Sequence, residues 1–132
     1  MSSFKLHIST PEKFFFNNDV ENVILTSIEG ELGVLAGHIP MVTALATGSV
    51  RMLVNGEWKT AFISGGFAEI KHDEVVVLAD TAEWPEEIEV NRALEAKKRA
   101  EERISLHKSE IEYARSVAAL QRAMTRLRIA KR

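Results

Sequence analysis

The chain changes character at Trp84-Pro85. Residues 1–84 consist of short apolar and polar alternations divided by Gly, Pro and Asn turns, whereas residues 85–132 are rich in Ala, Glu, Lys and Arg. The charge changes at the same point: residues 1–84 hold 5 Lys and Arg against 11 Asp and Glu, and residues 85–132 hold 12 against 8. The net charge of −2 therefore conceals two units of opposite sign, which indicates an interaction module with a basic arm.

Residues 1–84 are predicted to form an all-β sandwich or flattened barrel. Phe4, Leu6 and Ile8 alternate with polar residues, which is the period of a half-buried strand. Asn55-Gly56 predicts a two-residue type I′ hairpin turn, because that turn needs positive φ at both central positions. We expect about nine or ten short antiparallel strands with no helix between them. Four of them are expected at Met41–Ala46, Ser49–Val54, Trp58–Ser64 and Phe67–Lys71.

Residues 85–132 are predicted to form an antiparallel hairpin of two α-helices, over about 87–105 and 110–129. Pro85 suits the first turn of a helix, and Ser109 followed by Glu112 matches a capping box. Small residues dominate the first helix and bury little area, so at roughly 25 cal/mol per Å² the pair is held weakly. We therefore expect the hairpin to be conditional. Its expected apolar seams are Val90, Ala93, Ala96, Ala100 and Ile104 on the first helix, and Tyr113, Val117, Leu120, Met124 and Leu127 on the second.

Several classes of function are disfavoured by what the sequence lacks. The chain has no Cys, and its 4 His are scattered, so neither a thiol nucleophile nor a metal site is expected. No GxSxG motif accompanies His38, so we expect no catalysis. Tyr113 is the only aromatic residue of the tail, which disfavours nucleic-acid binding.

The sequence also bears on membrane association. The longest apolar run is Val75–Ala79, which is too short for a membrane-spanning helix, and no signal peptide is expected. Any membrane association is therefore expected to come through a partner.

The arginines of the tail are its main chemical signal. Arg92 and Arg99 lie seven residues apart and share a helix face, and Arg122 and Arg126 lie four apart and share another. Closing the hairpin crowds these like charges unless an anion lies among them. Guanidinium groups bind phosphates through paired hydrogen bonds, so a di- or triphosphate is a good candidate. The spacing also allows an ordinary solvated surface, with Glu95 as the partner of Arg99.

Two uncommon motifs carry a resemblance to a known family. Residues 30–40, GELGVLAGHIP, and residues 64–69, SGGFAE, are similar to segments of the epsilon subunits of bacterial F-type ATP synthases, which correspond to delta in mitochondria. Residues 87–93 and 119–127 resemble the two C-terminal helices of that family. The resemblance covers the whole chain, and it is to the Bacillus-like members that bind ATP.

The resemblance implies a sandwich of about ten strands that binds the gamma subunit and the c-ring at the foot of the central stalk. The helices would act as a brake on a proton-translocating motor. Folded, they permit ATP hydrolysis; extended along gamma toward the catalytic alpha and beta subunits, they inhibit it. ATP, with or without Mg²⁺, binds the folded form as the release signal. The resemblance further implies a non-catalytic peripheral subunit, without a catalytic cofactor, at the cytoplasmic face of a bacterial plasma membrane.

Carried over position by position, the resemblance implies an ATP site on the two helices and just before them. The motif (I/L)-D-x-x-R-A matches at Ile88, Arg92 and Ala93. Glu89 departs from it, because the motif has Asp there. If this carboxylate accepts a hydrogen bond from the nucleotide, we expect ATP binding to be weaker by about 1–3 kcal/mol. A structural adaptor that never binds nucleotide is the alternative. The implied site is Glu83, Ile88, Glu89, Arg92, Ala93, Arg99, Arg122 and Arg126.

Overall fold

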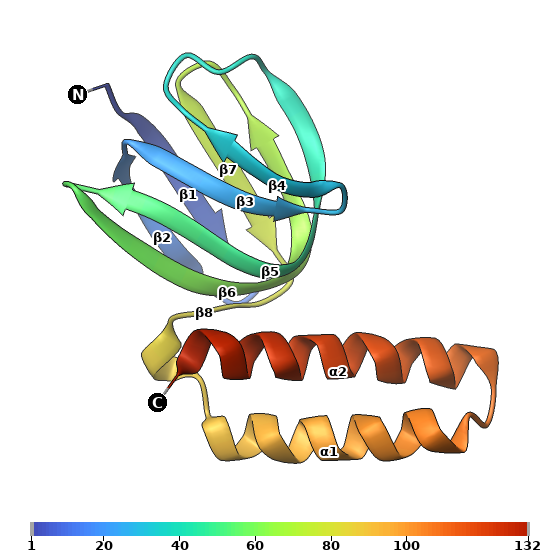
Figure 1. Cartoon of the computed structure of the whole chain (residues 1–132). Coiled ribbons are helices and arrows are strands. Elements are labelled where there is room, and N and C mark those ends of the chain that lie inside the picture. The colour runs from blue at the N-terminus through green and yellow to red at the C-terminus, as the bar shows by residue number, and fades with distance from the viewer. Residues whose placement is uncertain (1, 132) are drawn as a thin grey trace. The chain divides into compact units, whose positions relative to one another are not determined.

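A computed structural model of the chain describes residues 2–131. The residues group into two compact units, Met1–Trp84 and Pro85–Arg132. The first unit contains the strands and the second contains the helices (Figure 1). No helix among the described residues is both long enough and apolar enough to cross a membrane.

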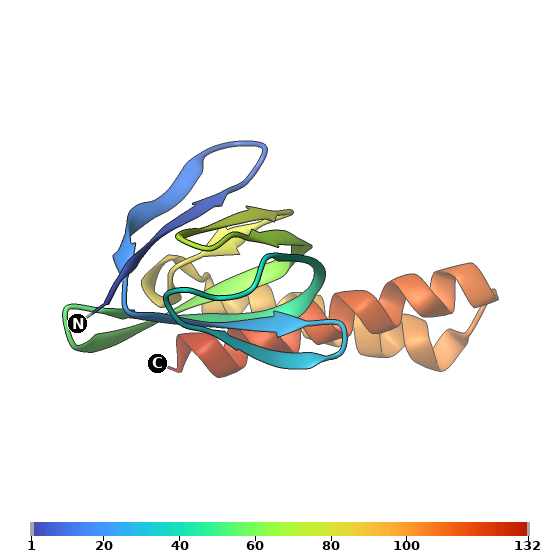
Figure 2. The ribbon, with the colours of Figure 1, turned by 90° about the horizontal axis from the view of Figure 1, so that it is seen from above.

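The first unit is a β-sandwich built from one continuous sheet, whose layers are visible in the view from above (Figure 2). The order of hydrogen-bonded neighbours is β2-β1-β7-β6-β5-β3-β4, and β8 pairs with β6 outside this path. This architecture confirms the predicted fold class. The strands are β1 (Phe4–Ser9), β2 (Phe14–Val20), β3 (Asn22–Ser27), β4 (Gly30–Val34), β5 (Met41–Val54), β6 (Glu57–Ile70), β7 (Glu74–Ala79) and β8 (Ala82–Glu83).

Two long strands replace four of the expected short ones. β5 and β6 each run for 14 residues and pair along their whole length. The described residues therefore form eight strands rather than nine or ten. Gly65 and Gly66 have φ values of 107° and 121°, a conformation that other residues rarely adopt. The expectation of separate strands at Trp58–Ser64 and Phe67–Lys71 was wrong, because the chain continues through these glycines as one strand, β6, that stays paired with β5.

One strand pair departs from the antiparallel expectation. β1 pairs with β2 antiparallel but with β7 parallel, with Leu6 opposite Val75 and Ile8 opposite Val77. A parallel pair needs a long connection, and the intervening strands β2–β6 supply it. The side chains of these residues are fully buried. They join Leu25 in the core between the two layers.

The predicted hairpin turn at Asn55-Gly56 is confirmed. The two residues have φ values of 51° and 79° and connect β5 to β6. The carboxylate of Glu21 accepts hydrogen bonds from the backbone N–H groups of Asn55, at 3.2 Å, and Gly56, at 3.1 Å. These bonds tie the tip of the hairpin to the residue that precedes β3.

The last residues of the first unit belong to the sandwich. In β8, Ala82 lies opposite Ile63 of β6 and Glu83 lies opposite Phe62. Trp84 then stacks on Phe15 of β2 with 4.5 Å between ring centroids. The strand pairing and the aromatic stack together hold the chain in place up to the residue before Pro85.

The second unit is a helical hairpin formed by α1 (Val90–Leu106) and α2 (Glu110–Ala130), preceded by the 3-10 turn η1 (Pro85–Glu87) (Figure 1). α1 begins three residues later than predicted, because Glu89 keeps an extended backbone with ψ of 99°. It ends at His107, which has a left-handed φ of 42°. The predicted cap of α2 is confirmed, because Ser109 Oγ accepts a hydrogen bond from Glu112 N at 3.1 Å.

The two helices pack along a seam that differs in part from the predicted one. On α1 the expected Ala93 and Ala100 are buried. On α2 the predicted Val117 and Met124 are 40% and 51% exposed. A seam lined with small side chains allows two helices to approach closely, which larger residues would prevent. The seam residues of α2, spaced by steps of four and three, are Ser116, Leu120, Ala123, Leu127 and Ala130, all buried or half-buried.

Candidate functional site

The predicted arginines of the hairpin flank the helix–helix seam. Arg92 and Arg99 directly precede the two buried alanines of α1, Arg122 directly precedes the buried Ala123, and Arg126 precedes the next seam residue of α2. A residue one position before a seam residue is turned by about 100° from it around the helix. When two antiparallel helices face each other, this offset places the preceding residues of both helices on the same side. We call this side the arginine face; it comprises Arg92, Arg99, Arg122 and Arg126.

The arginine face is short of carboxylate partners. Among residues 2–131, no carboxylate lies within 4.0 Å of the guanidinium groups of Arg92, Arg99 or Arg122. The pair between Glu95 and Arg99 that the sequence allowed is therefore not formed. Arg92 and Arg99 are exposed and Arg122 is half-buried. Like charges on one helical surface repel each other, so this surface favours an anionic ligand.

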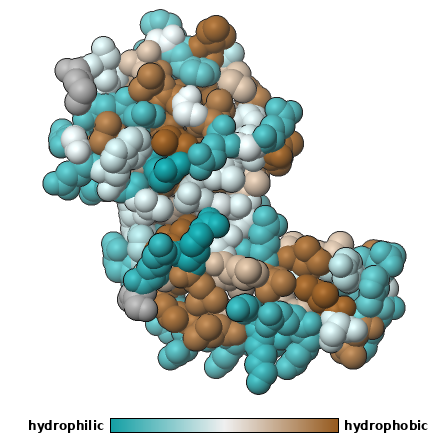
Figure 3. Space-filling view, in the orientation of Figure 1, coloured by the Kyte–Doolittle hydropathy of each residue, from teal (hydrophilic) through white to brown (hydrophobic). Residues whose placement is uncertain are grey.

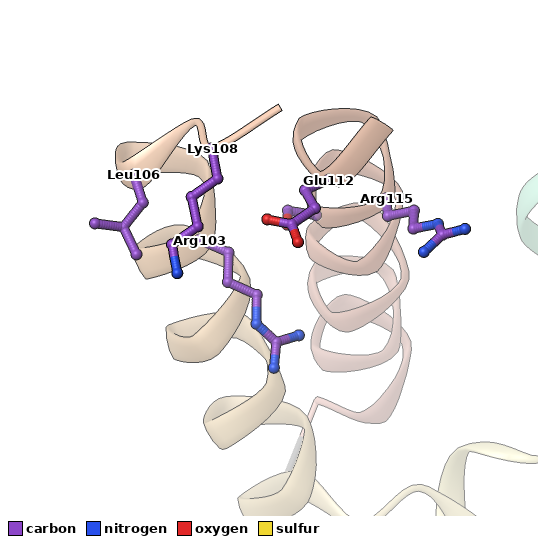
Figure 4. A pocket seen from close by; sticks show the side chains of 6 residues that line it. Arg103, Leu106, Lys108, Glu112 and Arg115 are labelled. Atoms are coloured by element: carbon purple, nitrogen blue, oxygen red, sulfur yellow. The ribbon is translucent and has the colours of Figure 1, made fainter. Parts of the chain in front are cut away.

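A pocket of about 350 Å³ lies at the turn end of the hairpin (Figure 4). In Figure 4, the guanidinium group of Arg103 points from α1 into the space between the helices, Lys108 of the turn lies along α1 above it, and Glu112 extends from α2 toward α1. Arg103 was missing from the predicted set, although it follows Arg99 by four residues, a spacing that shares a helix face. The pocket lengthens the arginine face toward the turn. It is lined by Arg103, Leu106, Lys108, Glu112, Arg115 and Ser116.

The structure places the other four predicted site residues in different environments. Ile88 is only 1% exposed, and Ala93 lies in the helix seam. Both side chains are apolar, so they can contribute packing contacts to a ligand but no charge. Glu89 is exposed at the N-cap of α1, and its carbonyl accepts the first helical hydrogen bond from Ala93 N at 3.0 Å. Glu83 is half-buried in β8 and belongs to the first unit. The hairpin therefore brings the four arginines together on one face, but not these four residues.

The described residues contain no group of three His, Asp or Glu side chains that could hold a metal ion. The candidate site is thus the arginine face, a set of guanidinium groups on one side of the hairpin. Such a set is suited to binding an anion that carries phosphate groups.

The fold and this site define a class of protein: a two-domain binding protein with a β-sandwich and a cationic helical arm. Two family models match it in the same order. The beta-sandwich domain of the ATP synthase delta/epsilon chain matches residues 3–85, and the long alpha-helix domain of that chain matches residues 86–131. The chain belongs to the delta/epsilon family of ATP synthase subunits.

Individual relatives agree with this assignment. The chain is 50% identical over 127 residues to the ATP synthase epsilon chain of Ruminiclostridium cellulolyticum, covering 96% of this chain and 95% of that one. It is 47% identical to the epsilon chain of Caldanaerobacter subterraneus, covering 98% and 95%. A chain in the structure of the Euglena gracilis mitochondrial ATP synthase, with OSCP, F1 and c-ring, matches with a TM-score of 0.84 and 27% identity, covering 98% and 82%. The predicted resemblance to the epsilon subunits of bacterial ATP synthases is confirmed.

Proposed function

We propose that this chain is the non-catalytic epsilon subunit of the central stalk of a proton-translocating F-type ATP synthase. Its sandwich would bind the gamma subunit and the c-ring, and its hairpin would inhibit ATP hydrolysis when it extends toward the catalytic alpha and beta subunits. The bacterial relatives and the match to a chain solved together with F1 and a c-ring support this role. The subunit would then be peripheral, on the cytoplasmic face of a bacterial plasma membrane, and held there through the complex.

Exposed apolar residues on the sandwich support the assembly step. Phe67 of β6 and Leu78 of β7 lie opposite each other and are 60% and 59% exposed. Figure 3 shows apolar side chains gathered at the surface of the strand unit. Adjacent exposed apolar side chains of this size favour a protein partner over bulk water. Replacing Phe67 by Asp is expected to weaken assembly onto the rotor, measured by sedimentation; unchanged assembly would exclude this patch.

The helix seam supports the proposed two-state arm. Ala93, Ala100 and Ala123 fill the contact between α1 and α2, so little apolar area is removed from water when the hairpin closes. Two larger side chains, Val117 and Met124, remain partly exposed. A closed hairpin of this kind needs little free energy to open, and a ligand that binds only the closed form can control it.

We further propose ATP, with or without Mg²⁺, as that ligand. The observation that carries this proposal is the arginine face, where like charges lie on one side of the hairpin. Arg92, Arg99 and Arg122 have no carboxylate partner among residues 2–131. A triphosphate would replace their repulsion with charge-assisted hydrogen bonds. At a hundredfold excess over its Kd, such a ligand stabilises the closed form by about 2.7 kcal/mol. High ATP would keep the arm closed, and low ATP would release it to inhibit the motor.

Calorimetric titration of the chain with ATP tests this proposal. The wild type is expected to bind, and Arg92→Ala is expected to bind at least tenfold more weakly, because hydrogen bonds to charged groups contribute about 1.5–3 kcal/mol. Arg128→Ala is a matched control, because Arg128 directly follows a seam residue of α2 and therefore lies on the opposite side from the arginine face. No binding heat with the wild type would leave a structural adaptor as the function.

A further inference from the structure

The two helices of the hairpin begin in different ways. At the start of α2, Ser109 Oγ accepts a hydrogen bond from Glu112 N at 3.1 Å. At the start of α1, Glu89 occupies the same N-cap position, but its side chain makes no capping hydrogen bond. Glu89 has the extended backbone of an N-cap residue, with φ of −79° and ψ of 99°. The backbone of α1 is therefore prepared for a cap that the side chain does not supply.

The length of the Glu side chain explains the missing cap. The first N–H groups of a helix have no partner within the helix, and a capping side chain at the N-cap satisfies one of them. Ser, Thr, Asp and Asn place an oxygen at the right distance, whereas the Glu carboxylate is one methylene further out. The first hydrogen bond inside α1 is the one from Ala93 N to Glu89 O. The N–H groups of Val90, Asn91 and Arg92 have no acceptor within the helix, and the Glu89 side chain caps none of them, which favours fraying of this turn.

This uncapped turn carries part of the candidate site. Arg92 and Ala93 both lie in it, so the position of the Arg92 guanidinium depends on whether the turn is ordered. The preceding η1 packs against α2, and Ile88 between η1 and α1 is buried. Ordering the first turn of α1 is therefore coupled to closing the hairpin.

We propose that residue 89 sets the ATP affinity of the hairpin by controlling the order of the first turn of α1, and not through a direct contact with the nucleotide. This inference rests on the proposed ATP binding. With Glu89 in place, part of the chain population has a frayed turn and a misplaced Arg92. The apparent affinity is the intrinsic affinity multiplied by the fraction of chains in which the turn is ordered. The chain thus keeps a lower ATP affinity than its arginines could provide.

The test replaces Glu89 with three capping residues of different charge, Asp, Asn and Ser, and titrates the full chain with ATP by calorimetry. All three variants are expected to bind ATP about two- to fivefold more tightly than the wild type. Hydrogen exchange at Asn91 and Arg92 without ATP is expected to slow by up to about fivefold in each. Asn91→Ser is the matched control: it introduces the same side chain inside the helix, where it cannot cap, and is expected to change neither quantity.

Three outcomes would overturn the inference. If the Asn and Ser variants and a Glu89→Gln variant all bind ATP more weakly, the carboxylate itself contacts the nucleotide. If the capping variants slow hydrogen exchange but leave ATP affinity unchanged, order in this turn does not control binding. If the wild type does not bind ATP at all, the proposed function fails and this inference fails with it. The exchange data then still report whether Glu89 leaves α1 uncapped.

Discussion

At the residue scale, the arginines of the hairpin combine packing with charge. Arg122 directly precedes Ala123, which is buried in the seam. The aliphatic part of such a side chain can lie along the seam edge while its guanidinium group reaches outward. The half-buried state of Arg122 fits this description. A guanidinium group held in this way can meet a phosphate with two parallel hydrogen bonds, which an ammonium group cannot do.

This difference gives a prediction for Arg122→Lys. The substitution keeps the positive charge but removes the paired hydrogen bonds, so the ATP affinity is expected to fall between those of the wild type and Arg122→Ala. Calorimetric titration of the three proteins measures the order. Arg128→Lys is the control on the opposite side of the hairpin. An Arg122→Lys variant that binds as tightly as the wild type would mean that charge alone recruits the nucleotide.

Gly48 in β5 provides a second residue-scale prediction, for the stability of the sandwich. A Cβ atom at this position would lie 2.7 Å from Thr26 Oγ1 and 2.8 Å from Thr26 Cβ, which is closer than atoms can pack. Thr26 cannot move freely, because its hydroxyl donates a hydrogen bond to Ser49 O at 2.9 Å. Gly48→Ala is therefore expected to lower the free energy of unfolding by about 1–3 kcal/mol in urea denaturation.

Gly33→Ala serves as the matched control for Gly48→Ala. Gly33 lies in β4 with no atom within 4 Å of an added Cβ and without a positive φ. It should change the free energy of unfolding by less than about 0.5 kcal/mol. Equal destabilisation by both substitutions would mean that the loss of glycine itself, and not the clash with Thr26, causes the effect.

At the element scale, the sequence predicted the type of each unit better than the contacts within it. Alternation and turn residues were enough to predict a β-sandwich, because a half-buried strand exposes every second residue. They could not show that β5 and β6 continue through Gly48, Gly65 and Gly66, since a glycine that bends a strand and one that ends it have the same sequence signature. Register and pairing depend on residues far apart in the chain.

The same limit, that local patterns do not reveal contacts between distant residues, applies to the candidate site. Residue spacing correctly grouped Arg92 with Arg99 and Arg122 with Arg126, because helical periodicity decides which residues share a face. It predicted the half-buried Leu120 and Leu127 of the α2 seam but also the exposed Val117 and Met124. Apolar periodicity weighs large side chains, whereas close packing of two helices selects small ones such as Ala123. The missing cap at Glu89 could not be predicted from residue spacing either. The predicted helix began at about 87, so Glu89 was placed inside the helix and not at its N-cap.

The seam yields an element-scale prediction. Ala123 is 1% exposed between the helices, so Ala123→Leu must push α1 and α2 apart and is expected to destabilise the closed hairpin by about 1–3 kcal/mol. ATP affinity should fall with it, because the arginine face exists only when the helices are paired. Thermal unfolding followed by circular dichroism, together with ATP titration, measures both effects. The neighbouring Met124→Leu is the control, because Met124 is 51% exposed; if it is equally destabilising, the α2 seam has been assigned wrongly.

At the scale of the whole molecule, charge is divided between the two units: 5 basic against 11 acidic residues in 1–84, and 12 against 8 in 85–132. An open arm would present its positive excess to an acidic partner surface. A bound triphosphate would offset much of that excess at the same time as it closes the hairpin. Both proposed effects of ATP would act in the same direction, toward relief of inhibition. Neither effect would need a change in the sandwich, which in the proposed function would stay attached to the rotor throughout.

This division predicts how ATP controls hydrolysis in the assembled enzyme. In a complex reconstituted with the full chain, inhibition of ATP hydrolysis is expected at low ATP and relief at millimolar ATP. Arg122→Ala should raise the ATP concentration for half-relief by tenfold or more, because it removes charge-assisted hydrogen bonds from the closed form. Lys98→Ala is the control, since Lys98 is exposed on α1 and lies away from the arginine face. If wild type and Arg122→Ala show the same ATP dependence, nucleotide bound to the hairpin does not set the state of the arm.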